Sequence, residues 1–102
     1  MSAALEKGVT ASEAGLSVDE QLRIVLRAIA DRGGKAEMRD LYEAVEKVIA
    51  ARLGGIGRLS DQGKASLREL VNRRAVREGY LLPHDPSDPG WRSTPKGRQF
   101  AG

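Results

Sequence analysis

The sequence predicts a mainly α-helical domain that closes with a small β-hairpin. Three segments repeat apolar residues at helical spacing and are each followed by glycine, and two short strand-like runs flank a turn-rich stretch near the C-terminus. At 102 residues the chain has room for one small domain. Residues 1–15 are small and polar without sustained periodicity, so we expect a flexible tail there and a domain over residues 16–102.

The first helix is predicted over residues 18 to 32. Ser17 and Glu20 form the S-x-x-E pattern of a capping box, in which each side chain satisfies a free backbone N–H of the first turn. Gly33 and Gly34 supply the stop. The residues of the apolar stripe lie at helical spacing: Val18, Leu22, Val25, Leu26 and Ile29.

Two further helices follow. After a short extended piece at residues 35–36, the second helix is predicted over 37 to 53, and the third over 61 to 78, with Ser60 as its cap. The second stripe contains Met38, Leu41, Tyr42, Val45, Val48, Ile49 and Leu53, and the third contains Leu67, Leu70, Val71 and Ala75.

The C-terminal part predicts a hairpin and a last helical turn. Residues 80–82 and 91–94 are strand-like, and the stretch PHDPSDPG between them is rich in turn residues. Asp85 and Asp88 are interpreted as turn formers. Thr94 followed by Pro95 predicts the cap and first position of a final helix that reaches Phe100.

Three helices, a short strand between the first two and a closing hairpin follow the order of a winged helix-turn-helix, with three helices and a two- or three-stranded wing sheet. Over about 85 residues the chain resembles winged-helix DNA-binding domains, and most of all the N-terminal domain of Mrr-type modification-dependent restriction proteins. The resemblance rests on REGYL at residues 77–81 and WRSTPKG at residues 91–97. A nuclease domain follows in full-length members, so this chain resembles their DNA-reading half.

Composition narrows the function classes. Without cysteine and with one histidine, the chain has almost nothing from which to build a zinc centre, and we expect no metal and no cofactor. No Ser/His/Asp set or carboxylate pair points to catalysis, so we expect no enzyme. The longest apolar runs are too short for a membrane span, and we expect a cytoplasmic protein. Residues 58–102 hold 9 basic and 5 acidic side chains, which suggests a polyanion partner.

The third helix has a polar face that suits the major groove of DNA. On a helical wheel this face carries amide, hydroxyl and guanidinium groups that can bond base edges. The predicted base-reading residues are Gln62, Ser66, Asn72 and Arg73. Cations on the flank of the helix and beside the hairpin are predicted to contact phosphates: Arg58, Lys64, Arg68, Arg92, Lys96 and Arg98.

Three residues need separate interpretations. Glu69 lies within the polar face, where it would repel phosphate unless it pairs with Arg73 or accepts a bond from cytosine; we favour the pair. Trp91 is interpreted as a core residue rather than a stacking platform for an unpaired base. Arg74 is expected to lie along the core with its charged end in solvent.

We therefore expect sequence- or modification-dependent binding of double-stranded DNA, with the third helix in the major groove and the base of the hairpin on phosphates. The resemblance implies that the domain serves a restriction system and acts with a nuclease domain. Two alternatives stay open: a protein-interaction or dimerisation module, which includes a homodimer, and a small transcription regulator.

Overall fold

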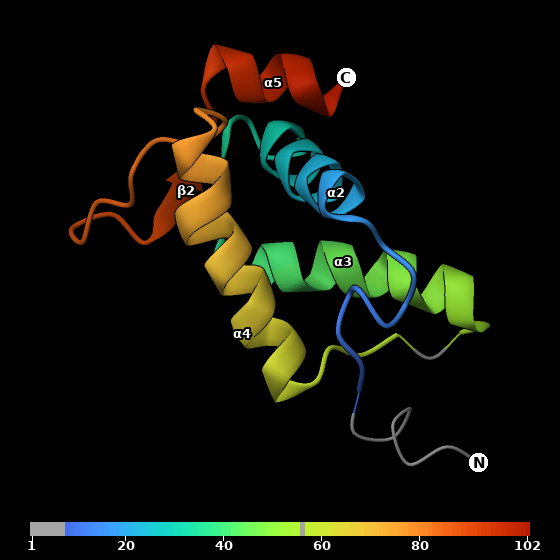
Figure 1. Ribbon diagram of the computed structural model, residues 1–102. Helices are drawn as coiled ribbons and strands as arrows, with labels where there is room; N and C mark the ends of the chain where they lie inside the picture. Colours follow the sequence, from blue (N-terminus) through green and yellow to red (C-terminus); the bar gives the residue numbers. More distant parts are fainter. Residues whose placement is uncertain (1–7, 56) are drawn as a thin grey trace.

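The computed structural model describes residues 8–55 and 57–102 (Figure 1). It is mainly helical, with one small antiparallel sheet. In chain order the elements are α2 (Val18–Asp31), β1 (Lys35–Glu37), α3 (Met38–Leu53), α4 (Asp61–Glu69), the π-helical segment η1 (Leu70–Ala75), β2 (Gly90–Arg92) and α5 (Pro95–Ala101). The coarse prediction of a mainly α-helical domain with a small β component is confirmed.

The helix starts lie where local sequence signals placed them. Ser17 and Glu20 make the capping box of α2, and the Ser60 hydroxyl accepts the Gly63 N–H at the start of α4. Thr94 caps α5, with Pro95 in the first turn. Capping groups act within one turn of their own helix, so their position in the sequence is enough to predict them.

The core is built from one apolar face of each long helix. The helices contribute the fully buried side chains of Leu22, Val25, Leu26 and Ile29 from α2, Leu41, Val45 and Ile49 from α3, and Leu67, Val71 and Ala75 from the third helix, and Leu81 is buried with them. Val18 and Leu53, which were expected in the stripes, are about 40% exposed. Each lies at an outer end of its helix, beyond the area that the neighbouring helices cover.

The sheet pairs strands that are distant in the sequence. β1 runs antiparallel to β2, with Ala36 opposite Trp91. The predicted pairing of residues 80–82 with 91–94 is present as an antiparallel bridge between Leu81 and Ser93. Two backbone hydrogen bonds flank it, from the Leu82 N–H to the Arg92 carbonyl and from the Thr94 N–H to the Tyr80 carbonyl. The segment with β2 therefore lies between β1 on one edge and the chain at Leu81 on the other.

The third helix is continuous but not uniformly α-helical. It was predicted as one helix over residues 61–78, and it consists of α4, then η1, then one more helical turn. A π-helical segment has i to i+5 hydrogen bonds and is often found at functional sites. The π-helical segment contains Asn72 and Arg73, so the helical period differs at these two residues from the period in α4.

Residues 8–15 differ from the flexible tail that the sequence predicted. Their segment packs on the start of α4: the Val9 N–H donates to the Arg58 carbonyl and the Ser60 N–H donates to the Val9 carbonyl. Val9, Ala11, Ala14 and Leu16 are buried. The pattern was missed because small apolar residues in an arm do not repeat with a helical period. The rest of the predicted tail, residues 1–7, lies outside the described residues.

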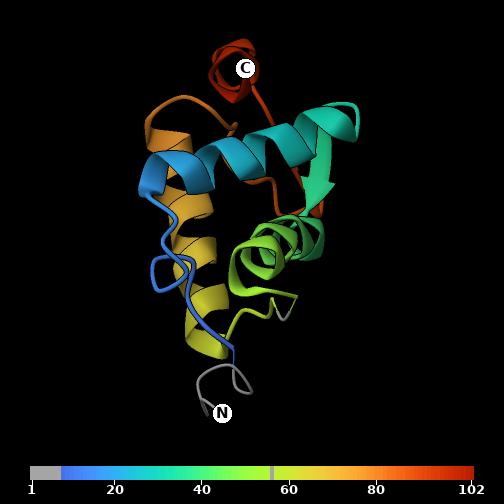
Figure 2. The ribbon, with the colours of Figure 1, turned by 90° about the vertical axis from the view of Figure 1, so that its right-hand side faces the viewer.

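Different segments lie at the two ends of the third helix. In both views the start of α4 lies near the arm of residues 8–16, and α5 lies beyond the opposite end of the third helix, packed against α2 (Figures 1 and 2). Among the described residues, no helix is long and apolar enough to cross a membrane.

Candidate nucleic-acid interface

The polar face of the third helix is open to solvent. The four predicted base-reading residues, Gln62, Ser66, Asn72 and Arg73, are all exposed, and Ala65 beside them is exposed too. Leu67 and Val71 on the opposite side are buried, so the helix is held by one face and presents the other. This confirms the predicted orientation of the helix.

Glu69 and Arg73 form the pair that the sequence analysis favoured. The Arg73 Nε lies 2.9 Å from a Glu69 carboxylate oxygen, one helical turn away, and both side chains are more than half exposed. An exposed pair of this kind contributes at most about 1 kcal/mol. Arg73 is therefore free to exchange this partner for a base or a phosphate at little cost.

Lys64 and Arg68 lie on the flank of α4 that faces α3, where both contact Tyr42. The Arg68 Nη1 donates a 2.8 Å hydrogen bond to the Tyr42 hydroxyl, and the Lys64 ammonium lies 5.6 Å from the centre of the Tyr42 ring. Sequence reasoning placed Tyr42 in the apolar stripe of the second helix. A half-buried phenol usually needs a polar partner, so the hydroxyl of Tyr42 could have indicated from the sequence that this side chain also makes a polar contact outside the core.

Arg58 lies just before the third helix and is exposed. Its carbonyl oxygen accepts the Val9 N–H, which fixes its backbone beside the start of α4. In the described part of the chain no carboxylate lies within ion-pair distance of its side chain. Three cations therefore surround the first half of the third helix without a carboxylate partner in the described residues. Arg58 precedes the helix, and Lys64 and Arg68 lie along one flank of α4.

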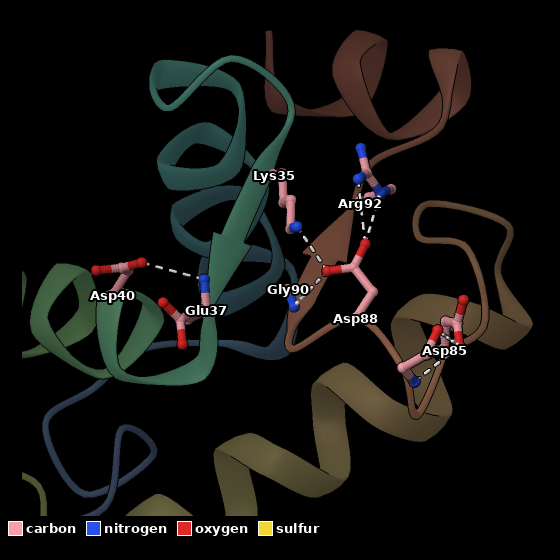
Figure 3. A network of polar contacts seen from close by, with 8 residues as sticks. Lys35, Glu37, Asp40, Asp85, Asp88, Gly90 and Arg92 are labelled. Atoms are coloured by element: carbon pink, nitrogen blue, oxygen red, sulfur yellow. Dashed lines mark hydrogen bonds and ion pairs between the residues drawn. The ribbon is translucent and has the colours of Figure 1, made fainter.

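Arg92 does not offer a free charge. Its guanidinium contacts the Asp88 carboxylate at 3.1 Å, and the other oxygen of that carboxylate lies 2.6 Å from the Lys35 ammonium (Figure 3). Asp88 is thus more than the turn former that the sequence suggested, because it joins the loop before β2 to β1. Hydrogen bonds from Lys35 above all, and then from the Gly90 N–H, lower the pKa of Asp88 to about 2.

Asp85, in the same loop, behaves as predicted. Its carboxylate accepts hydrogen bonds from the N–H and the hydroxyl of Ser87, within its own turn. These bonds lower the pKa of Asp85. The tip of the loop is therefore held by local bonds around an acid, which does not favour contact with phosphate.

Lys96 and Arg98 lie away from the start of α4. The Thr94 hydroxyl donates to the Gly79 carbonyl, so α5 begins at the far end of the third helix, roughly 25 Å from residue 61 at 1.5 Å per residue. The Lys96 ammonium lies 5.4 Å from the centre of the Tyr80 ring. The first turn of α5 also packs against Tyr80, where a Cβ at Gly97 would clash with the Tyr80 carbonyl oxygen. Lys96 therefore lies at the base of the predicted hairpin, at the opposite end of the third helix from Arg58 and Lys64.

Trp91 is buried, as expected of a core residue. The His84 ring lies 4.8 Å from the Trp91 ring, and the two border a depression of about 540 Å³ beside Arg68 and Asn72. This depression joins the loop before β2 to the polar face of the third helix. The Arg74 side chain is half exposed, which agrees with a charged end in solvent, and its guanidinium lies 3.7 Å from the Glu78 carboxylate.

Within the described residues no cluster of three or more histidine, aspartate or glutamate side chains is arranged to hold a metal ion. Comparison with protein-family models, with curated proteins and with solved structures found no match.

Proposed function

We propose that this protein is a winged-helix domain that binds double-stranded DNA, with the third helix in the major groove. The observation that carries the proposal is the third helix itself. One face is buried, the opposite face presents Gln62, Ser66, Asn72 and Arg73 to solvent, and the flank holds Lys64 and Arg68. Amide and guanidinium groups bond base edges, and flanking cations bind phosphates.

The order of the elements supports the winged-helix assignment. A strand between the first two helices pairs with a strand after the third, and the chain at Leu81 lies on the other side of that strand. In such a domain the second helix supports the third, whose N-terminal part enters the groove. Here α3 takes the supporting role through Tyr42, and α4 is the groove helix.

The phosphate contacts are proposed for a smaller set than the sequence suggested. Arg58, Lys64 and Arg68 remain, because they surround the start and flank of α4 and have no carboxylate partner among the described residues. Arg92 is paired with Asp88, and Lys96 and Arg98 lie at the other end of the third helix. Three contacts of this kind would supply most of the affinity and make it dependent on salt.

The resemblance to the reading domain of Mrr-type restriction proteins extends this proposal. It favours modified DNA as the target and a nuclease domain as the functional partner. A cytoplasmic location, expected from the sequence, is compatible with this role. A transcription regulator would use the same interface and would differ in its target, a palindromic operator if the protein forms a dimer. Both versions make the domain a binding module without catalysis of its own.

A dimerisation module is the second candidate function, and one groove favours it. Between α2 and α3, on the side away from the third helix, lies a groove of about 710 Å³ with an apolar floor that includes Ile24, Ala28, Ala44 and Val48. Charged side chains of both signs border it, including Arg23, Arg27, Glu43 and Lys47. A mixed border over an apolar floor can match a second copy of itself.

The experiment is a fluorescence-anisotropy titration of a mixed-sequence duplex of about 20 base pairs across about 50 to 200 mM salt. Lys64→Ala is compared with Lys47→Ala, which removes the same charge from the groove between α2 and α3. DNA binding through α4 requires steep salt dependence and a loss of affinity in Lys64→Ala alone.

The competing outcomes are separate. Equal losses in both variants would show non-specific charge attraction and contradict an interface at α4. Absence of binding at 50 mM salt, together with a sedimentation coefficient that rises with protein concentration, would favour the dimerisation module. A base-methylated duplex in the same series tests the restriction version, which requires tighter binding of the methylated DNA.

A further inference from the structure

Tyr42 contacts two neighbouring cations of the proposed interface. Its hydroxyl accepts a hydrogen bond from the Arg68 guanidinium at 2.8 Å, and its ring lies 5.6 Å from the Lys64 ammonium. Lys64 and Arg68 are one helical turn apart on α4, whereas Tyr42 comes from α3. Two side chains with several rotatable bonds each are therefore held on one rigid ring from another helix.

The contacts of Lys64 and Arg68 differ from those of three other arginines. Arg73, Arg74 and Arg92 each have a carboxylate within 4 Å, but in the described residues no carboxylate lies that close to Lys64 or Arg68. Two adjacent cations repel each other, and a neutral phenol orders them without cancelling their charge. A carboxylate in the place of Tyr42 would order the same side chains and would also repel an anionic ligand.

We propose that Tyr42 is a positioning residue and that Tyr42, Lys64 and Arg68 form one binding unit for the DNA sugar–phosphate backbone. This inference rests on the proposed function and adds to it. It places one DNA strand along the α3 side of α4 and assigns to α3 a direct effect on affinity.

The physical reason is preorganisation. A free arginine or lysine loses conformational entropy when it binds a phosphate, and a side chain that is already ordered loses less. The Tyr42 hydrogen bond uses one of the five N–H groups of Arg68 and leaves the others for phosphate oxygens. Removal of the hydroxyl should therefore weaken binding even though Tyr42 carries no charge.

The test compares Tyr42→Phe, which removes only the hydroxyl, with Tyr42→Leu, which also removes the ring beneath Lys64. We expect Tyr42→Phe to weaken DNA binding about three- to tenfold and Tyr42→Leu to weaken it further. The slope of log affinity against log salt should become shallower by up to about one for each cation that stops contacting phosphate. Thermal unfolding of each variant checks that the domain stays folded.

Tyr80→Phe is the matched control, since Tyr80 stacks on Phe100 at 4.5 Å beyond the other end of the third helix. It should leave affinity and salt slope unchanged. A double-mutant cycle then shows whether Tyr42 acts through Arg68: Tyr42→Phe should have little effect in the Arg68→Ala background.

The outcomes distinguish this inference from the proposed function. If the wild-type protein shows no salt-dependent DNA binding, both fail. If it binds and Tyr42→Phe has wild-type affinity, the inference alone fails. An equal loss from Tyr42→Phe with and without Arg68 would also overturn it, because Tyr42 would then contact DNA by itself.

Discussion

The Asp88 carboxylate lies 2.6 Å from the Lys35 ammonium and 3.1 Å from the Arg92 guanidinium, and so ties the loop before β2 to both strands of the sheet (Figure 3). Asp88 also accepts the Gly90 N–H at 3.2 Å. The pairing of Lys35 with Arg92 across the sheet would otherwise place two cations directly opposite each other. Asp88 neutralises that repulsion where β1 and β2 meet.

Replacement of Asp88 by asparagine should lower the stability of the domain, and the effect should depend on pH. Hydrogen bonds from Lys35, the Gly90 N–H and Arg92 lower the pKa of Asp88 from 3.8 to about 2 in the folded state. The group therefore stabilises the fold above pH 3.8, and this contribution is lost as the pH falls through about 2. Melting temperatures of the wild type and Asp88→Asn should differ at pH 7 and converge near pH 2.

Asp85→Asn is the control for this experiment, because the Asp85 carboxylate accepts its hydrogen bonds from Ser87 of the same loop. It should lower the melting temperature less than Asp88→Asn does at pH 7. A difference between the wild type and Asp88→Asn that stays constant from pH 7 to pH 2 would contradict an electrostatic role for Asp88.

The features that the sequence predicted well are those with local causes. Ser17, Ser60 and Thr94 each cap a helix through a bond to a residue three positions later, and the apolar stripes repeat within one helix. The features it missed are contacts between distant segments. Val9 forms a bridge with Leu59 and is buried there. No local pattern around either residue predicts that the two segments pair.

In the candidate site, too, local patterns were predicted from the sequence and contacts between distant segments were not. The exposure of Asn72 and Arg73 followed from the helical period, although the period changes in η1 and a wheel at 100° per residue loses accuracy there. Lys96 lies beside Tyr80 of the predicted hairpin, as its position in the sequence suggested, but the bond from Thr94 to Gly79 places it at the end of the third helix away from Lys64. The role of Tyr42 required the distance between two helices, which no single-sequence pattern contains.

Arg73→Ala and Lys64→Ala should have different effects on DNA recognition. If Arg73 bonds a guanine, its loss should cost about 1–3 kcal/mol on duplexes that carry this guanine and little on others. Loss of Lys64 should weaken binding to all duplexes by a similar factor, since phosphates are the same in every sequence. Titrations against a panel of duplexes with single base-pair changes provide the measurement. Uniform losses for both variants would exclude Arg73 as a base-reading residue.

Glu69→Gln should increase DNA affinity. It removes a negative charge from the polar face of the third helix and releases Arg73 from the 2.9 Å ion pair. We expect a gain of about two- to fivefold near 0.1 M salt. The stability should change by less than about 1 kcal/mol, because both partners are more than half exposed.

Glu78→Gln is the control for Glu69→Gln. It breaks an ion pair of the same i, i+4 type, with Arg74, at the far end of the helix. Its effect on affinity should be smaller than that of Glu69→Gln. An equal gain in both variants would attribute the effect to net charge rather than to the face of α4.

Gly63→Ala should destabilise the domain, although alanine is normally the better helix residue. A Cβ at position 63 would lie 2.6 Å from the Val9 carbonyl oxygen and 3.1 Å from the Thr10 Cα, so the arm of residues 8–16 would have to move off the start of α4. We expect a loss of about 1–3 kcal/mol, measured by urea unfolding. Gln62→Ala, on the exposed side of the same turn, should change the unfolding free energy by no more than about 0.5 kcal/mol. A Gly63→Ala protein as stable as the wild type would show that the arm does not pack against α4 in solution, and the shielding of Val9 and Leu59 would then need another source.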